Sequence, residues 1–194
     1  PRAIALLGAA QLGAGADPSA IARLEQAIAR NPGDRSARLD LAGLYIAVGD
    51  APRAVELLQS IPPAREDARR EYLLIRALAA TRGEAEAGKE VEKLVRDNPQ
   101  DVERLNMAAA FQLSFGEAAA AVATLERASI VQPGHALTLI NLGRVGLARG
   151  DLDGAEAAMR RALSQDANRR EQLQQPDQRQ YRQQPGNPAL LRAQ

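Results

Sequence analysis

The chain has 194 residues, a formal net charge of +1 and a sequence pI of about 8.8. This charge provides no strong field to attract nucleic acid or an anionic membrane. The absence of cysteine excludes disulfides and thiolate metal sites, and it leaves the redox compartment open. Hydrophobic residues make up 45% of the chain but aromatic residues only 3%, so alanine and leucine must form most of the core. This composition, without alternating β-branched runs, indicates an all-α fold.

The first stretch, residues 1–34, has the pattern of two short helices joined by a turn. Small Gly8 marks a place where the two helices touch. Asp17 can cap the second helix, and Pro18 is tolerated in its first turn. The chain starts without Met, a signal peptide or a cap for the first helix, so we expect further chain before Pro1 in the full protein.

The next two stretches, residues 35–67 and 68–101, repeat this pattern less regularly. Pro62 and Pro63 should end the second helix of the former, which makes that unit one residue shorter than its neighbours. In the latter, Ile75 occupies a position where a small residue is expected. We predict that the bulk of Ile75 pushes its helix pair apart.

The clearest repetition lies between residues 102–135 and 136–169, which align without a gap. Each copy has two apolar-periodic segments separated by a glycine and an acid, at Gly116 and Gly150. Two short helices packed as a hairpin fit this spacing.

The repeated unit resembles the tetratricopeptide repeat, whose period is about 34 residues. The resemblance lies in small residues at the helix contact, alanines and a larger apolar residue along the second helix, and a closing proline. These residues are Ala108, Ala109, Ala121, Leu125, Ala128 and Pro133, with Leu142, Gly143, Ala155, Met159 and Ala162 in the next copy. The resemblance implies a right-handed α-solenoid of five helix hairpins over residues 1–169, with units 1–34, 35–67, 68–101, 102–135 and 136–169.

Residues 170–194 differ in composition, because they are rich in Gln and Arg and contain three prolines. We interpret them as a frayed helix that runs into a flexible tail, and the alternative is that residues 168–175 form a short helix that caps the last hairpin.

Few residues suggest catalysis. His135 is the one histidine, and it lies in a turn with no visible partner, so we interpret it as a solvated residue and not as a general base or a metal ligand. The Glu- and Lys-rich stretch 84–96 has the spacing of a solvated helix face with its own ion pairs. We therefore expect no enzyme activity, no cofactor and no metal site.

The resemblance implies a concave surface lined by the first helix of each hairpin. Carrying over the family's groove positions gives Leu39, Asp40, Gly43, Tyr72, Leu73, Arg76, Asn106, Met107, Ala110, Ile140, Asn141 and Arg144. The asparagines can pair with peptide amides, and the two arginines can hold a carboxylate. The alternative is that Asn106 and Asn141 hold the helices of their own hairpins together and that Arg144 lies over the surface.

Some members of the family clamp the terminal carboxylate of a chaperone peptide with Lys, Asn and Arg residues from three successive repeats. Only Asn141 matches such a position here, because Tyr72, Ala110 and Leu137 stand where polar or basic groups are needed. We therefore do not expect a chaperone clamp.

The resemblance implies a non-catalytic scaffold that binds a partner protein or peptide. Ala/Leu-rich arrays of this kind resemble those of bacterial pilus-assembly lipoproteins and exopolysaccharide-export scaffolds, which favours a periplasmic or cell-envelope location over the cytoplasm. One alternative is self-association through exposed array ends. A further alternative is nucleic-acid or polysaccharide binding by the tail, but Tyr181 is its one aromatic residue, so we expect no nucleic-acid partner. No apolar run reaches the roughly 18 residues of a membrane span.

Overall fold

The computed structural model describes residues 18–65 and 67–174. Within that range the regular elements are α-helices, and no strand is present apart from an isolated bridge between Ala64 and Asp67. The helices are α2 (Pro18–Arg30), α3 (Arg35–Ala47), α4 (Ala51–Gln59), α5 (Arg69–Arg82), α6 (Glu84–Asp97), α7 (Val102–Ser114), α8 (Ala118–Val131), α9 (Ala136–Arg149) and α10 (Leu152–Gln174). The expectation of an all-α solenoid is confirmed.

The helices begin and end where short-range signals in the sequence place them. Asp34 and Asp101 accept hydrogen bonds from backbone amides in the first turns of α3 and α7, at 3.0 and 2.9 Å. Gly116 and Gly150 have φ of 78° and 76°, a region that favours glycine, and they separate the two helices of their hairpins.

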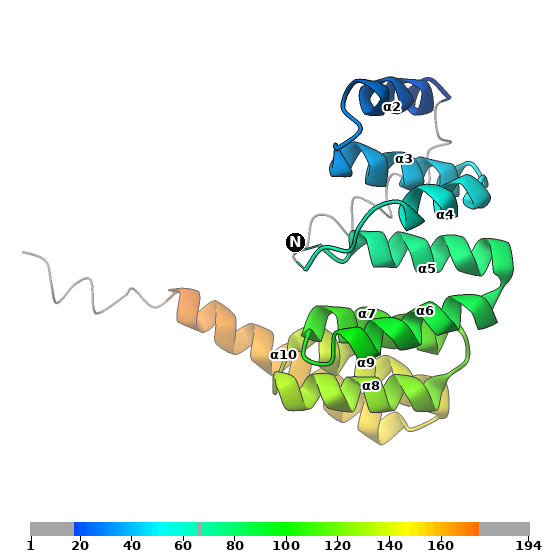
Figure 1. Ribbon diagram of the computed structural model, residues 1–194. Helices are drawn as coiled ribbons and strands as arrows, with labels where there is room; N and C mark the ends of the chain where they lie inside the picture. Colours follow the sequence, from blue (N-terminus) through cyan, green and yellow to red (C-terminus); the bar gives the residue numbers. More distant parts are fainter. Residues whose placement is uncertain (1–17, 66, 175–194) are drawn as a thin grey trace, which may run out of the picture.

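Successive helices pack as antiparallel hairpins in a stack (Figure 1). The pairs are α3 with α4, α5 with α6, α7 with α8, and α9 with α10, while α2 packs on α3. Helix α10 runs unbroken to Gln174, so residues 168–174 continue the last helix and do not form a separate short capping helix. The expected first helix of residues 1–34 and the end of the tail, from residue 175 on, lie outside the described residues.

The connection between the second and third hairpins is held by two buried arginines. Helix α4 ends at Gln59, shortly before the two prolines. The guanidinium of Arg70 donates to the carbonyl of Leu58 at 3.0 Å, and that of Arg104 donates to the carbonyl of Arg65 at 2.9 Å. These charged donors thus bind carbonyl groups at the end of α4 and in the loop that follows it.

Helix α2 is joined to α3 by a side-chain hydrogen bond. The Tyr45 hydroxyl donates to the carboxylate of Glu25 at 2.8 Å. Burial, and then this contact with Glu25, raise the pKa of Tyr45 above its usual value.

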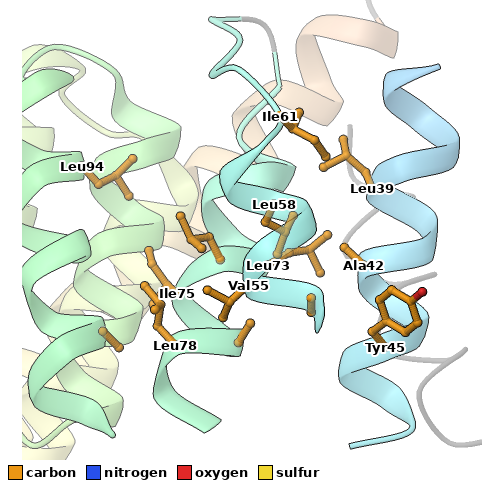
Figure 2. Packing of buried hydrophobic residues seen from close by; sticks show 14 of the residues in the cluster. Leu39, Ala42, Tyr45, Val55, Leu58, Ile61, Leu73, Ile75, Leu78 and Leu94 are labelled. Atoms are coloured by element: carbon orange, nitrogen blue, oxygen red, sulfur yellow. The ribbon is translucent and has the colours of Figure 1, made fainter. Parts of the chain in front are cut away.

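The largest apolar cluster spans helices α3 to α6 (Figure 2). Ile75 is fully buried in it, and α5 and α6 stay packed against each other. Ala87 of α6, a small residue, is fully buried in the same cluster. That Ile75 widens the spacing between these two helices stays a prediction.

Replacing Ile75 by alanine should destabilise the protein by about 2–5 kcal/mol, because it leaves a cavity in a closed core. Urea unfolding followed by far-UV circular dichroism measures this. If Ile75 strained the hairpin, the same substitution would leave the stability unchanged or raise it. Ile130→Ala is the control, since Ile130 is 81% exposed and its loss should change the stability by less than about 0.5 kcal/mol.

Candidate partner-binding face

We call the surface formed by α3, α5, α7 and α9 the first-helix face, because these are the first helices of their hairpins. The residues expected to contact a partner all come from these helices. Eight of them are exposed or partly exposed: Asp40, Gly43, Tyr72, Arg76, Met107, Ala110, Ile140 and Arg144. The other four, Leu39, Leu73, Asn106 and Asn141, are buried and so are not available to a partner in this structure.

One repeat position shows why the expectation holds for some residues and not for others. In successive hairpins this position is occupied by Leu39, Tyr72, Asn106 and Ile140. The side chains of Leu39 and Asn106 are 2% and 1% exposed, while those of Tyr72 and Ile140 are 42% and 40% exposed. Where the next first helix packs closely, as α5 does on α3 and α9 on α7, the residue is covered. Tyr72 stays exposed because α7 stands away from α5, and no first helix follows α9 among the described residues.

The buried asparagines form a link between hairpins. The side-chain amide of Asn106 in α7 donates to the Thr138 hydroxyl in α9 at 2.7 Å and to the Val102 carbonyl at 2.8 Å. Asn141 in α9 donates to the side-chain oxygen of Asn106 at 3.0 Å. The alternative that each asparagine holds its own hairpin together therefore needs correction, since the bonds join α7 to α9.

His135 extends this polar network to the surface. Its Nδ1 lies 3.1 Å from the Thr138 hydroxyl, and its Nε2 lies 3.5 Å from the Glu103 carboxylate. The side chain is 18% exposed, so the expectation of a solvated histidine is wrong. The contact with Glu103 could not be predicted from the sequence, because Glu103 belongs to the preceding hairpin.

A row of aromatic side chains lies between α5 and α7. The ring of Tyr72 is 5.6 Å from that of Phe111, and Phe111 is 6.0 Å from Phe115. The guanidinium of Arg76 lies 5.6 Å from the Tyr72 ring centroid, within reach of a cation–π interaction. We call Arg76, Tyr72, Phe111 and Phe115 the aromatic row. Sequence reasoning missed the two phenylalanines, although Met107, Phe111 and Phe115 are spaced four residues apart on one side of α7.

These large side chains account for the separation of α5 and α7. The backbones of these two helices approach each other at very few points, unlike those of α3 and α5 or of α7 and α9. In the neighbouring repeats, the residues that align with Phe111 are Ala77 in α5 and Val145 in α9. Phe111 and Phe115 instead reach over to the core of the preceding hairpins, where they are partly buried. The first-helix face is therefore interrupted at this point by an aromatic surface in which Tyr72 is exposed and the two phenylalanines are partly buried.

Other charged groups pair locally. In α6, Lys89 donates to Glu86 at 2.8 Å, and this hydrogen bond lowers the pKa of Glu86. Within residues 18–65 and 67–174, no cluster of three or more His, Cys, Asp or Glu residues could hold a metal ion. None of the helices in the described range is long and apolar enough to span a membrane.

The stacked helix hairpins define the chain as an α-solenoid. Two models of the tetratricopeptide repeat match residues 11–74 and 107–170, which together make up about two thirds of the chain. The chain therefore belongs to the tetratricopeptide repeat family.

Solved structures of MamA share this fold. A crystal structure of MamA superposes with a TM-score of 0.56 at 18% identity, covering 78% of this chain and 89% of that one. The structure titled MamA MSR-1 C2 gives a TM-score of 0.53 at 20% identity, covering 83% and 93%. A MamA RS-1 double mutant gives 0.56 at 14% identity, covering 87% and 95%. At such identities the likeness concerns the fold alone. No curated protein matches the sequence significantly.

Replacing Asn106 by alanine should destabilise the protein by about 1–3 kcal/mol, because Asn141 and Thr138 lose a buried partner. The double variant Asn106→Ala/Asn141→Ala should cost less than the two single changes together, since they remove the same bond. Urea unfolding of the three variants measures both effects. Purely additive losses would show that the two amides are not coupled, and exposed Gln100→Ala serves as the control.

Proposed function

We propose that the chain is a non-catalytic scaffold that binds a partner protein or peptide on its first-helix face. The observation that carries the proposal is the exposure of large apolar side chains beside arginines on this face. Tyr72 and Ile140 are 42% and 40% exposed, and Arg76 and Arg144 come from the same helices. Membership of a repeat family that presents extended binding surfaces supports it.

The non-catalytic part of the proposal is supported by His135. Both ring nitrogens have a partner in the network between α7 and α9, at 3.1 Å and 3.5 Å. A histidine held in this way by Thr138 and Glu103 has a structural role, and we assign it that role.

We further propose that the scaffold serves in bacterial cell-envelope assembly, such as pilus assembly, secretion or exopolysaccharide export. The support is compositional, since Ala/Leu-rich arrays of this type are similar to those of envelope systems. The identity of a captured partner tests this placement directly.

Self-association is the second candidate, because the last hairpin exposes an apolar surface. Ile140, Leu147 and Leu152 are 40%, 55% and 66% exposed. In the preceding hairpin, the residues at the same three positions are partly or fully covered by α9. Asn106 forms a hydrogen bond to α9. Leu113 and Ala118 pack in one cluster with Val145 of α9. Sedimentation velocity tests this alternative, which fails if the chain is a monomer at every concentration. Binding through the tail gains no support, because residues 175–194 lie outside the described range.

Affinity capture from a lysate of the source organism should isolate a partner that requires the two arginines. The full chain is compared with Arg76→Glu/Arg144→Glu, whose reversed charges should weaken capture by about tenfold or more. The matched control is Arg127→Glu/Arg161→Glu, which makes the same charge change at exposed positions of the second helices α8 and α10.

The control variant should capture the partner as the unchanged chain does. Equal capture by all three chains would place the binding site away from the first-helix face. Circular dichroism spectra of the variants verify that each one is folded.

A further inference from the structure

We propose that the first-helix face recognises an acidic, amphipathic peptide segment, which places apolar side chains on the aromatic row and carboxylates against Arg76 and Arg144. This inference rests on the proposed function and adds to it the chemistry of the partner. It is carried by the distribution of charge between the two sides of the hairpins and by the exposed aromatic surface.

Charge is divided unevenly between the first and second helices. Helices α3, α5, α7 and α9 contain nine arginines and three acidic residues. The second helices α4, α6, α8 and α10 contain nine basic and eleven acidic residues. The first helices are thus strongly cationic, while the second helices carry a small excess of negative charge.

The acidic groups on the first helices are already engaged by basic neighbours. Asp40 forms an ion pair with Arg69 at 2.5 Å, and Glu103 lies 3.5 Å from His135. Glu71, the third of these acids, is buried beside Arg70. In the described part of the chain, neither Arg76 nor Arg144 forms an ion pair with a carboxylate, and Arg76 contacts the Tyr72 ring instead.

Arg76 and Arg144 stand at the same repeat position, two hairpins apart. The hairpin between them has Ala110 at that position, and the hairpin before them has Gly43. Small residues alternate with arginines, so nothing at this position projects between the two guanidinium groups. Packed helices are spaced by about 8–10 Å, and α7 stands further than that from α5, so Arg76 and Arg144 lie at least about 20 Å apart.

A bound segment must span this distance. A helical segment needs about 13 residues to cover 20 Å, and an extended one about six. Between the two arginines the segment would pass the aromatic row, where the exposed part of Tyr72, beside Arg76 and Phe111, can contact an apolar side chain. The matching partner has carboxylates near both ends of such a segment and apolar side chains between them.

Fluorescence anisotropy with three labelled helical peptides of about 14 residues tests the proposal. The first peptide carries Glu near both ends and Leu and Phe along one side. In the second, each Glu is replaced by Lys. In the third, the Leu and Phe residues are replaced by Ser. The full chain should bind the first peptide, and the other two at least about tenfold more weakly.

Charge-reversed chains complete the design. Arg76→Glu/Arg144→Glu should weaken binding of the first peptide by about tenfold or more and strengthen binding of the Lys peptide. Tyr72→Ala should weaken binding of the first peptide without changing the preference for Glu over Lys. Arg127→Glu/Arg161→Glu should bind all three peptides as the unchanged chain does.

Three results would overturn the proposal: equal binding of the Glu and Lys peptides, equal loss in the second-helix control variant, or no binding of any peptide. If one of these occurs while affinity capture still yields a partner that depends on Arg76 and Arg144, protein binding stands and only the acidic chemistry fails. If the capture also fails, the proposed function fails with it.

Discussion

Close approach of the two helices in each hairpin is the constraint on which the structure depends. In the last hairpin a Cβ atom on Gly143 would come within 2.7 Å of the Met159 side chain, and one on Gly146 would lie 3.1 Å from the Cβ of Ala155. In the hairpin before it, Ala109 and Ala121 are almost completely buried. The small residues therefore set the separation of the helices, and larger side chains can only be placed around them.

The spacing between hairpins is set by side-chain size at other positions. Where α9 meets α7, short polar side chains allow hydrogen bonds between the helices, as Asn106 and Thr138 show. Where α7 meets α5, Phe111 and Phe115 occupy that space. The repeat is thus regular within hairpins and variable between them, and this variation gives the first-helix face its individual surface.

The sequence was sufficient for features that depend on neighbouring residues. Asp34 and Asp101 cap helices and Gly116 and Gly150 end them through contacts within a few residues, so their roles could be predicted. Burial along the first helices could not be predicted in this way, because it depends on how closely the next hairpin packs. Leu39 and Tyr72 share a repeat position, yet one is buried and the other exposed.

The candidate face was predicted in part for the same reason. Carrying over repeat positions was enough to find Arg76, Arg144 and Tyr72, because the described helices leave them exposed or partly exposed. Phe111 could not be found in this way, because the aligned residues in the neighbouring hairpins are Ala77 and Val145. Its importance arises from the contact with Tyr72 across two hairpins, which only the structure reveals.

The total charge of the chain also concealed a property of the fold. A formal net charge of +1 gave no reason to expect an anionic partner. Within the helices of the four hairpins, however, eleven of the fourteen acidic residues lie on the second helices, and nine arginines lie on the first. Exposed charges are screened beyond about 8–10 Å in physiological salt, which is about the distance between packed helices. A partner that approaches the first helices therefore meets local positive charge, and the compensating acids behind them have little influence on it.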